Sequence, residues 1–423
     1  MRPRLFDSER ARGKTREMIT DDRIIFGLLA AVLAFVFATR DREGWQRFYT
    51  FVPMILVCYL LPSLMVTFGL IDVGESQLWP IAKDYFLPAA LFLMTLSIDM
   101  KGILGLGPKA LIMFFTATIG IVLGGPIALW LVAQADPSII GAGDTAAYRG
   151  LATLAGSWIG GGANQTAMLE VYQYDQSRYA ALIAVDIIVA NIWMAFLLYG
   201  AGASERVDRW LGADSSAIDA LRDKMADYTS SVERVAKAND YVLLFGVTFA
   251  VVGLAHLLAG WLGGAFAAAM GEEAVLASSF FWVVVIATTL GLGASFTRAR
   301  NLEGVGASKF GTVFIFLLVA VIGTKMNILQ LGDAPGFMAV GLVWMLFHVI
   351  LLLAVAKIIR APFFFVAVGS KANVGGAASA PVVAAAFHPA LAPVGVLLAV
   401  LGYALGTYGA IICAEMMRAV SGM

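Results

Sequence analysis

Long apolar stretches alternate with short polar segments along nearly the whole chain. A membrane-spanning helix needs about 20 consecutive, mostly apolar residues. Runs of roughly this length occur at residues 23–39, 51–70, 84–100, 109–134, 179–200, 239–262, 276–296, 311–327, 337–358 and 390–418. The pattern predicts an all-α polytopic membrane protein with about ten transmembrane helices.

Two further apolar segments, 150–173 and 361–388, are rich in glycine. If each folds back as a re-entrant hairpin, each half of the chain has five spans, and an odd number of spans places the halves in opposite orientations. Such inverted repeats are typical of secondary transporters. If both segments cross the membrane fully, the repeats are parallel instead. We prefer two inverted repeats, each with a Gly-rich re-entrant or broken helix.

The two Gly-rich segments also align with each other. Pairing Gly160 with Gly375 gives an offset of 215 residues, and the same offset pairs Gly161 with Gly376. Each half therefore reads as a helix, a Gly-rich break and one long helix, which is the order expected of an internal repeat.

Polar segments divide the chain into four parts. These are a polar N-terminal tail (1–22), a first membrane repeat (23–200), a polar linker with mixed charge (201–238) and a second membrane repeat (239–423). Loops after the odd-numbered spans carry 16 Lys and Arg residues, against 5 in the opposite set of loops. The Arg-rich N-terminal tail, partly offset by five acidic residues, lies with the opposite set and contradicts this asymmetry. The positive-inside rule then places the linker in the cytoplasm.

Composition agrees with a membrane protein. Hydrophobic residues make up 60% of the chain and charged residues 14%, whereas soluble domains carry roughly a quarter charged residues. The net charge is zero, so nothing favours nucleic-acid binding. Cys58 and Cys413 both lie in apolar runs and form neither a disulfide framework nor a metal-ligand spacing.

The two breaks are the candidate substrate site. Irregular backbone at membrane depth leaves N–H and C=O groups unpaired and survives only where it lines a cavity or meets a ligand. Helix N-termini at such a break offer free N–H donors to an anion. The alternative is close helix packing through small residues. The candidate residues are Ser157, Gly160, Gly161, Gly162, Asn164, Gln165 and Thr166 in the first break, and Ser370, Lys371, Asn373, Gly375, Gly376 and Ser379 in the second.

Asp186 lies within the apolar sequence AALIAVDIIVANIWMAFLL. A carboxylate inside a membrane span is expensive and usually functional. With Asn191 on the same helix, it is the candidate site for a coupling sodium ion or proton. The alternative is a structural carboxylate paired with Lys371 or with a buried hydroxyl. His256 and His348 are single histidines in apolar runs and are interpreted as packing residues.

No HExxH, GxSxG, Walker or paired-cysteine motif is present, so the sequence indicates no enzyme. Three functions remain open: a cation-coupled transporter, a channel, and an intramembrane enzyme that uses Asp186. A channel would need a continuous polar pore, but the polar residues gather at the two breaks. An enzyme would need a reactive pair, for which Asp186 is the one candidate.

The segments GSWIGGGANQTAM, AVDIIVANIWMAFLL, FYTFVPMILVCYLLPSLMVTFGLI and KANVGGAASAPVVAAAFHPALAPVGVLLAVLGYALGTYGAII resemble the bacterial and plastid membrane proteins of the domain-of-unknown-function 819 family. The similarity spans most of residues 24–418. The family is similar in architecture to sodium/glutamate symporters and to the cation antiporter and anion transporter group, which have inverted halves, a scaffold and a mobile core. The resemblance implies substrate contacts at Asn164, Thr166, Asn373 and Ser379, and an ion site near Asp186.

Together these observations predict a sodium- or proton-coupled secondary transporter of a small organic solute that is anionic or amino-acid-like. We expect a multi-pass protein of the bacterial inner membrane. Its partners would be the solute and membrane lipid, with no nucleic acid, and a homodimer is allowed for. No cofactor or metal is expected beyond a sodium ion.

Overall fold

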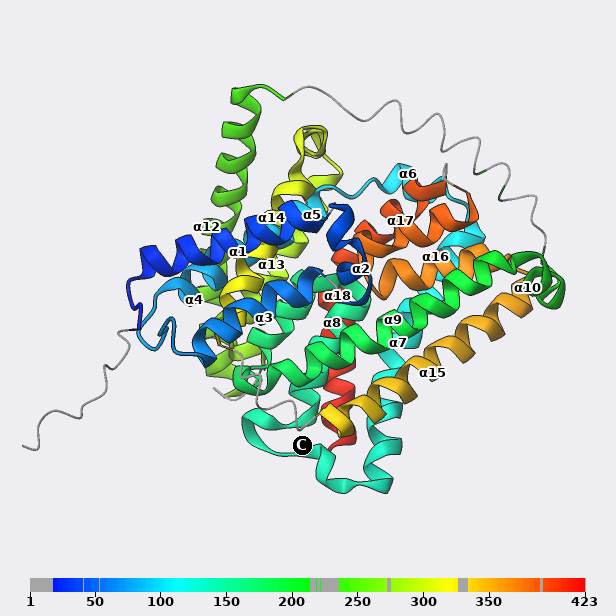
Figure 1. The fold of residues 1–423 in the computed structure, drawn as a ribbon, viewed down its shortest axis with the longest axis horizontal. Helices are drawn as coiled ribbons and strands as arrows, with labels where there is room; N and C mark the ends of the chain where they lie inside the picture. The colour runs from blue at the N-terminus through cyan, green and yellow to red at the C-terminus, as the bar shows by residue number, and fades with distance from the viewer. Residues whose placement is uncertain are drawn as a thin grey trace, which may run out of the picture.

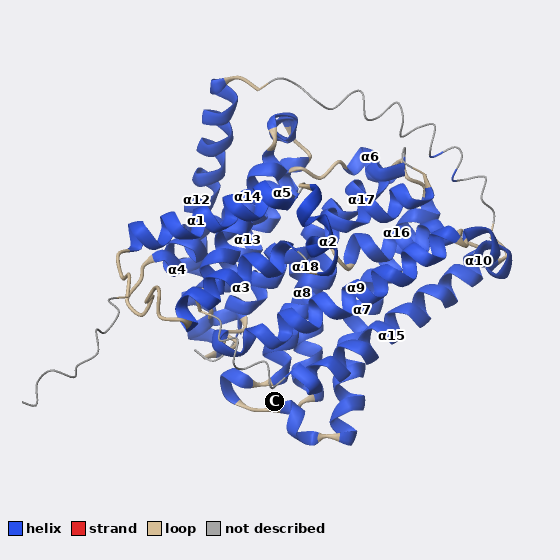
Figure 2. Cartoon of the chain, in the orientation of Figure 1, coloured by secondary structure: helices blue, strands red, loops and turns tan. Residues whose placement is uncertain are grey.

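The computed structural model describes residues 18–40, 42–52, 54–213, 218, 221, 236–271, 275–325, 334–388 and 391–422. Most of the predicted N-terminal tail and much of the linker lie outside these residues. Within the described residues every regular element is a helix, and Ile19 and Ile71 form an isolated β-bridge (Figure 2). The predicted all-α membrane class is therefore confirmed.

The helices follow the apolar runs along the chain. The first half contains α1 (Asp22–Arg40), α2 (Glu43–Phe51), α3 (Met54–Thr67), α4 (Leu78–Ile81), the π-helical turn η1 (Ala82–Phe86), α5 (Leu87–Leu96), α6 (Met100–Leu104), α7 (Pro108–Ala135), α8 (Ala147–Val171), α9 (Tyr179–Gly202) and α10 (Ser204–Leu211). The second half contains α12 (Ala238–Met270), α13 (Ser279–Ser295), the 3-10 helix η6 (Arg298–Val305), α14 (Ala307–Gly323), α15 (Ala334–Ile359), α16 (Phe363–Asn373), α17 (Gly376–Phe387) and α18 (Ala392–Val420).

Six helices among the described residues are long and apolar enough to cross a membrane, namely α1, α7, α9, α12, α15 and α18. A seventh is possible if α13 and η6, bent by 96°, count as one span. The apolar helices α3 and α14 have 14 and 17 residues, which gives lengths of only about 21 and 26 Å against a hydrocarbon core of about 30 Å. The predicted total of ten spans is thus not confirmed.

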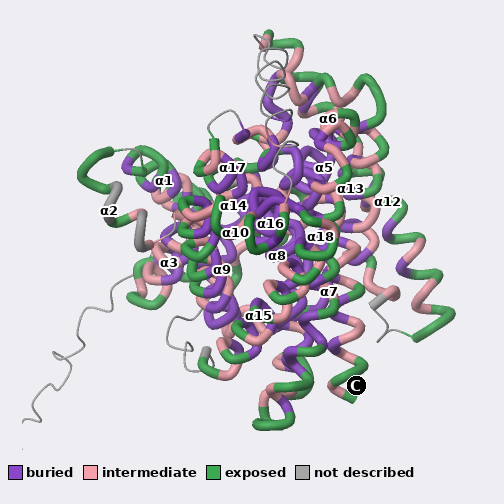
Figure 3. The backbone as a smooth tube through the Cα atoms, turned by 90° about the vertical axis from the view of Figure 1, so that its right-hand side faces the viewer, coloured by how far each residue is buried: buried purple, intermediate pink, exposed green. Residues whose placement is uncertain are grey.

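The helices form two units (Figure 1). The core unit consists of α7, α8, α9, α15, α16, α17 and α18, and the outer unit of α1, α3, α5, α12, α13 and α14. Each unit takes helices from both halves of the sequence, and contacts within a unit far outnumber those between units. Buried residues concentrate around α8, α16 and α18, whereas α12 is largely exposed along its length (Figure 3).

Both Gly-rich segments fold back as helical hairpins. At the open end of α8, Arg149 Nη1 donates a hydrogen bond to the carbonyl of Tyr172 at 2.8 Å. Nearer its tip, a Cβ placed on Gly156 would lie 2.6 Å from the carbonyl oxygen of Asn164. The start of α16 and the end of α17 meet in the same way, because the ring of Phe364 packs 5.3 Å from that of Phe387. Both segments therefore have the fold-back geometry that the hairpin interpretation expects.

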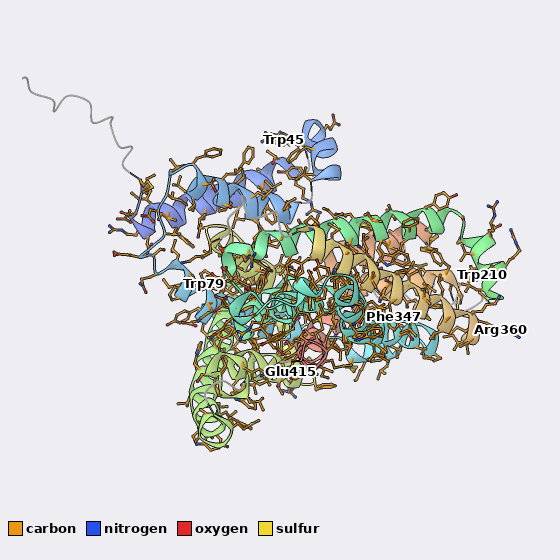
Figure 4. All side chains as sticks on the ribbon, turned by 90° about the horizontal axis from the view of Figure 1, so that it is seen from below. Trp45, Trp79, Trp210, Phe347, Arg360 and Glu415 are labelled. Carbon is orange, nitrogen blue, oxygen red and sulfur yellow. The ribbon has the colours of Figure 1, made fainter. Side chains whose placement is uncertain are left out.

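Contacts among the loops show which helix ends lie on the same side of the helix bundle. Lys109 Nζ, at the start of α7, donates to the carbonyl of Arg360 at 3.2 Å. The N–H of Phe363 donates to Asp208 Oδ1 at 2.7 Å, and burial raises the pKa of this carboxyl although the bond opposes the rise. Figure 4 shows Trp210 and Arg360 at the same end of the molecule. Since α7 starts and α9 ends on this side, the α8 hairpin opens on the opposite side and the α16–α17 hairpin on this one.

These loops are the ones whose Lys and Arg excess predicts a cytoplasmic location. A cysteine introduced at Glu205, whose side chain is 93% exposed, should therefore resist a membrane-impermeant thiol reagent in intact cells and react in lysed cells. Both native cysteines are buried, so the background should be low. Equal labelling in intact and lysed cells would reverse the orientation.

Candidate functional site

The first break lies at Gly161, at the tip of the α8 hairpin. Its φ of +72° and ψ of −169° belong to a region that is essentially open only to glycine. Gly161 and Gly162 are partly exposed, and a Cβ on Gly162 would have its nearest neighbour at 3.7 Å, on Ile315. These two glycines therefore border open space.

Gly160 has a different role from its two neighbours. A Cβ at this position would lie 2.7 Å from the Cα of Gly406 on α18. A Cβ on Gly402, one turn earlier on α18, would lie 2.6 Å from the carbonyl oxygen of Ile159. The backbones of α8 and α18 thus cross at these glycines, which is the small-residue packing left open by the sequence.

Asp186 joins α9 to both arms of the α8 hairpin. Its Oδ2 accepts from Ser157 Oγ at 2.6 Å and from Gln165 Nε2 at 3.1 Å. Its Oδ1 accepts from Trp158 Nε1 at 2.7 Å. Bonds to a carboxylate are stronger than bonds between neutral groups, so Asp186 holds the two arms at a fixed distance from α9.

The second break lies between α16 and α17. Gly375 and Gly376 have φ values of +119° and +57°, and Gly375 is exposed. A Cβ on Gly375 would lie 3.1 Å from Lys371 Nζ and close to Ser379 Oγ. The Ser379 hydroxyl is buried and has no hydrogen-bond partner among the described residues. An ammonium and a free hydroxyl therefore converge on an exposed glycine.

Lys371 is a buried cation with few partners. It is 2% exposed, and its Nζ donates one hydrogen bond, to the carbonyl of Ala190 at 3.1 Å. No carboxylate of the described residues lies within the 4.0 Å of an ion pair. Lys371 and Asp186 nonetheless lie close enough to interact electrostatically. Of the two structural alternatives for Asp186, the direct pair with Lys371 is therefore wrong. The bond to a buried hydroxyl is observed, because Ser157 Oγ donates to Asp186.

One face of α9 contacts both hairpins. Asp186 binds α8, Ala190 accepts from Lys371, and Trp193 Nε1 donates to Ser370 Oγ at 2.8 Å. Positions 186, 190 and 193 follow the i, i+4, i+7 spacing of one helix face. Trp193 was not predicted from the sequence, although this spacing from Asp186 could have indicated it. His348, which was expected to be a packing residue, is fully buried, and its Nε2 lies 2.8 Å from the Ser370 hydroxyl.

Asn191 does not join Asp186. It is exposed, while the three partners of Asp186 all belong to α8. Five residues along a helix amount to a rotation of about 500°, which places Asn191 roughly 140° away from Asp186. The expectation that the two share one ion site is therefore wrong.

The two predicted asparagines hold the hairpins in place. Asn164 Nδ2 donates to the carbonyls of Gly160 and Tyr403, and its Oδ1 accepts from Thr407 Oγ1 at 2.6 Å. Its side chain is fully buried. These bonds leave Asn164 little capacity for a substrate, so its observed contacts are structural.

Asn373 is bound in a similar way, but to α7. Its Nδ2 donates to the carbonyls of Phe114 and Gly369, and its Oδ1 accepts from Thr118 at 2.8 Å. Thr166, the other polar residue near the first tip, donates to the carbonyl of Gly162 at 3.0 Å. That bond leaves the lone pairs of the Thr166 hydroxyl free to accept.

Tyr403 on α18 connects the two breaks. Its carbonyl accepts from Asn164, and its ring lies 3.7 Å from a Cβ placed on Gly161. At the other break, its hydroxyl lies near the backbone N–H of Ala377. The tips of both hairpins thus meet between α9 and α18, and Tyr403, which lies in an apolar run, gave no signal in the sequence.

Comparisons with known proteins relate the chain to membrane proteins of uncharacterised function. The profile of a family described as "Protein of unknown function (DUF819)" matches residues 27–420. The chain is also similar to the "Uncharacterized membrane protein YjcL" of Bacillus subtilis (strain 168). The two are 24% identical over 396 residues, which cover 91% of this chain and 94% of the relative.

Proposed function

The chain belongs to the DUF819 family of membrane proteins, and on that premise we propose that it is a cation-coupled secondary active transporter of a small organic solute. The observation that carries the proposal is the meeting of two hairpin tips beside one helix, α9, with a partly buried carboxylate at Asp186 and a buried ammonium at Lys371. Charged groups inside a membrane bundle mark ion and substrate pathways.

The second break fits the anionic group of a solute. Lys371 Nζ has three protons and makes one hydrogen bond, while Ser379 Oγ has no partner among the described residues. The N-terminus of α17 lies at the same break and favours negative charge. A carboxylate bound there would compensate a cation that is costly to bury alone. Small carboxylates and amino acids are therefore the solute classes that the site favours.

The arrangement of the two units suits alternating access. The hairpins belong to the core unit, which makes few contacts with the outer unit, and they open on opposite sides. This supports the inverted-repeat interpretation, in which one part rocks against the other around a fixed site. We place the protein in the bacterial inner membrane, where an ion gradient can drive such a cycle.

Purified protein should first be screened for thermal stabilisation by small carboxylates, amino acids and short peptides, with and without sodium. Proteoliposomes should take up the best stabilising solute against its own concentration gradient. This uptake should saturate and should occur only when an ion gradient is imposed. Lys371→Met should reduce this uptake by roughly 10-fold or more, because one buried charged contact to the solute is worth about 1.5–3 kcal/mol.

Lys101→Met is the matched control, since Lys101 is exposed and far from the breaks in sequence. It should retain wild-type uptake. Flux that does not saturate and needs no ion gradient would instead identify a channel. Chemical conversion of the solute would identify an enzyme. Unchanged uptake in the Lys371→Met variant would remove Lys371 from the site.

A further inference from the structure

Three buried hydroxyls converge beside Asp186. They belong to Tyr59 on α3, Thr166 on α8 and Tyr179 on α9, whose exposed fractions are 1%, 0% and 0%. The Tyr59 hydroxyl faces those of Tyr179 and Thr166, and the tyrosine rings pack edge to face at 6.4 Å. Both tyrosine hydroxyls lie within electrostatic reach of the Asp186 carboxylate.

The two tyrosine hydroxyls are close to each other but make no well-formed hydrogen bond with any described residue. A buried polar group without a partner costs about 1–3 kcal/mol. Two such hydroxyls next to each other have oxygen lone pairs available to coordinate a ligand. The Thr166 hydroxyl adds a third oxygen, because its proton is already given to Gly162.

The charge of Asp186 favours a cation over an additional proton. Its Oδ1 accepts from Trp158 Nε1, and an indole N–H can only donate, so a proton on Oδ1 would break this bond. Oδ2 accepts from both Ser157 and Gln165. All three bonds favour the ionised carboxylate and oppose the effect of burial, so we take Asp186 as a negative charge next to the unpartnered oxygens.

We propose that the hydroxyls of Tyr59, Thr166 and Tyr179, next to the charge of Asp186, bind a sodium ion. Hard cations prefer neutral and anionic oxygen ligands, and one nearby negative charge suits a monovalent ion better than a divalent one. This inference rests on the proposed transporter function and names its coupling ion.

The same charges explain coupling to an anionic solute. With Asp186 and Lys371 both charged, the empty site is neutral. Sodium alone would leave one net positive charge and the anion alone one net negative charge, and an unbalanced charge is costly in a low-dielectric interior. Binding both ligands restores neutrality, so each should increase the affinity for the other.

The test is a sodium titration of the thermal stability of the purified full-length protein at constant ionic strength, with choline chloride as the replacement salt. Sodium should raise the midpoint of unfolding, and potassium should do so much less. Tyr59→Phe and Thr166→Val each remove one oxygen and keep the shape. Each should increase the half-saturating sodium concentration by about tenfold, the factor for 1.4 kcal/mol.

Tyr199→Phe is the matched control, because Tyr199 lies on α9 and is 78% exposed; it should titrate like the wild type. Equal stabilisation by sodium, potassium and choline would overturn the sodium site. So would an unchanged titration in both Tyr59→Phe and Thr166→Val, which would mean that the hydroxyls hold a water molecule. If Tyr59→Phe does not fold, Thr166→Val decides alone.

A separate outcome distinguishes this inference from the transporter proposal. Concentrative uptake that follows a proton gradient and ignores sodium would overturn the sodium site and leave the transporter standing. If the protein binds sodium specifically but transports none of the solutes that stabilise it, the transporter proposal is overturned and the sodium site is kept.

Discussion

Asp186→Asn should reduce concentrative uptake by roughly 100-fold, the factor that corresponds to about 3 kcal/mol. Asparagine has one acceptor oxygen, so it cannot accept from Ser157, Gln165 and Trp158 as the carboxylate does. Its NH2 group would face at least one donor. The charge that would attract the coupling ion is also lost. Uptake into proteoliposomes under an imposed ion gradient measures the effect.

Thermal stability of the same variant should fall as well, because the two arms of the α8 hairpin lose their common partner on α9. Lys371→Met, combined with Asp186→Asn, should recover part of the stability by removing a cation that no longer has a nearby anion. It should not recover uptake. Full rescue of uptake by the double variant would show that the two charges only compensate each other and that neither binds the ion or the solute.

Asn191→Ala is the control for Asp186→Asn, since Asn191 lies on the same helix and is exposed. It should leave uptake and stability unchanged. A stable Asp186→Asn protein with complete ion-driven uptake would contradict both the coupling role and the structural role of the carboxylate.

Gly160→Val should prevent stable folding rather than only transport. Even a Cβ at this position would lie 2.7 Å from the Cα of Gly406 and 2.7 Å from Asn164 Cγ. Backbone atoms cannot move aside as a flexible side chain can, so α8 and α18 would have to separate. Overpacking of this kind costs about 1–3 kcal/mol and occasionally more. The unfolding midpoint and the yield of monodisperse protein measure the loss.

Gly162→Ala is the matched substitution two residues further on. Its nearest neighbour would lie at 3.7 Å, an ordinary contact, and Gly162, unlike Gly161, does not have a positive φ. It should fold normally, and any change should appear in transport because Gly162 borders the open side of the tip. Wild-type stability in Gly160→Val, with Gly162→Ala unstable, would reverse these roles.

Several features of this protein follow from the sequence alone. The membrane class, the positions of the two Gly-rich hairpins and the presence of charged side chains at Asp186 and Lys371 within the helix bundle could all be predicted. The physical reason is that the membrane penalises polar groups and irregular backbone at each position, whatever surrounds it. A charge or a run of glycines inside an apolar segment is therefore informative before any partner is known.

Other features depend on residues that are distant in the sequence. Gly160 and Gly161 are adjacent and identical residues, yet they differ in the structure. Gly160 packs against α18, whereas Gly161 has the positive φ that breaks the helix. Asn373 looked like a ligand residue until Phe114 and Thr118 of α7 and Gly369 of its own helix took up its side chain. Tyr59 and Tyr179 gave no signal in the sequence, because a hydroxyl acquires a role only through the groups that it faces. Such pairings arise from the crossing of helices, which no local pattern of residues encodes.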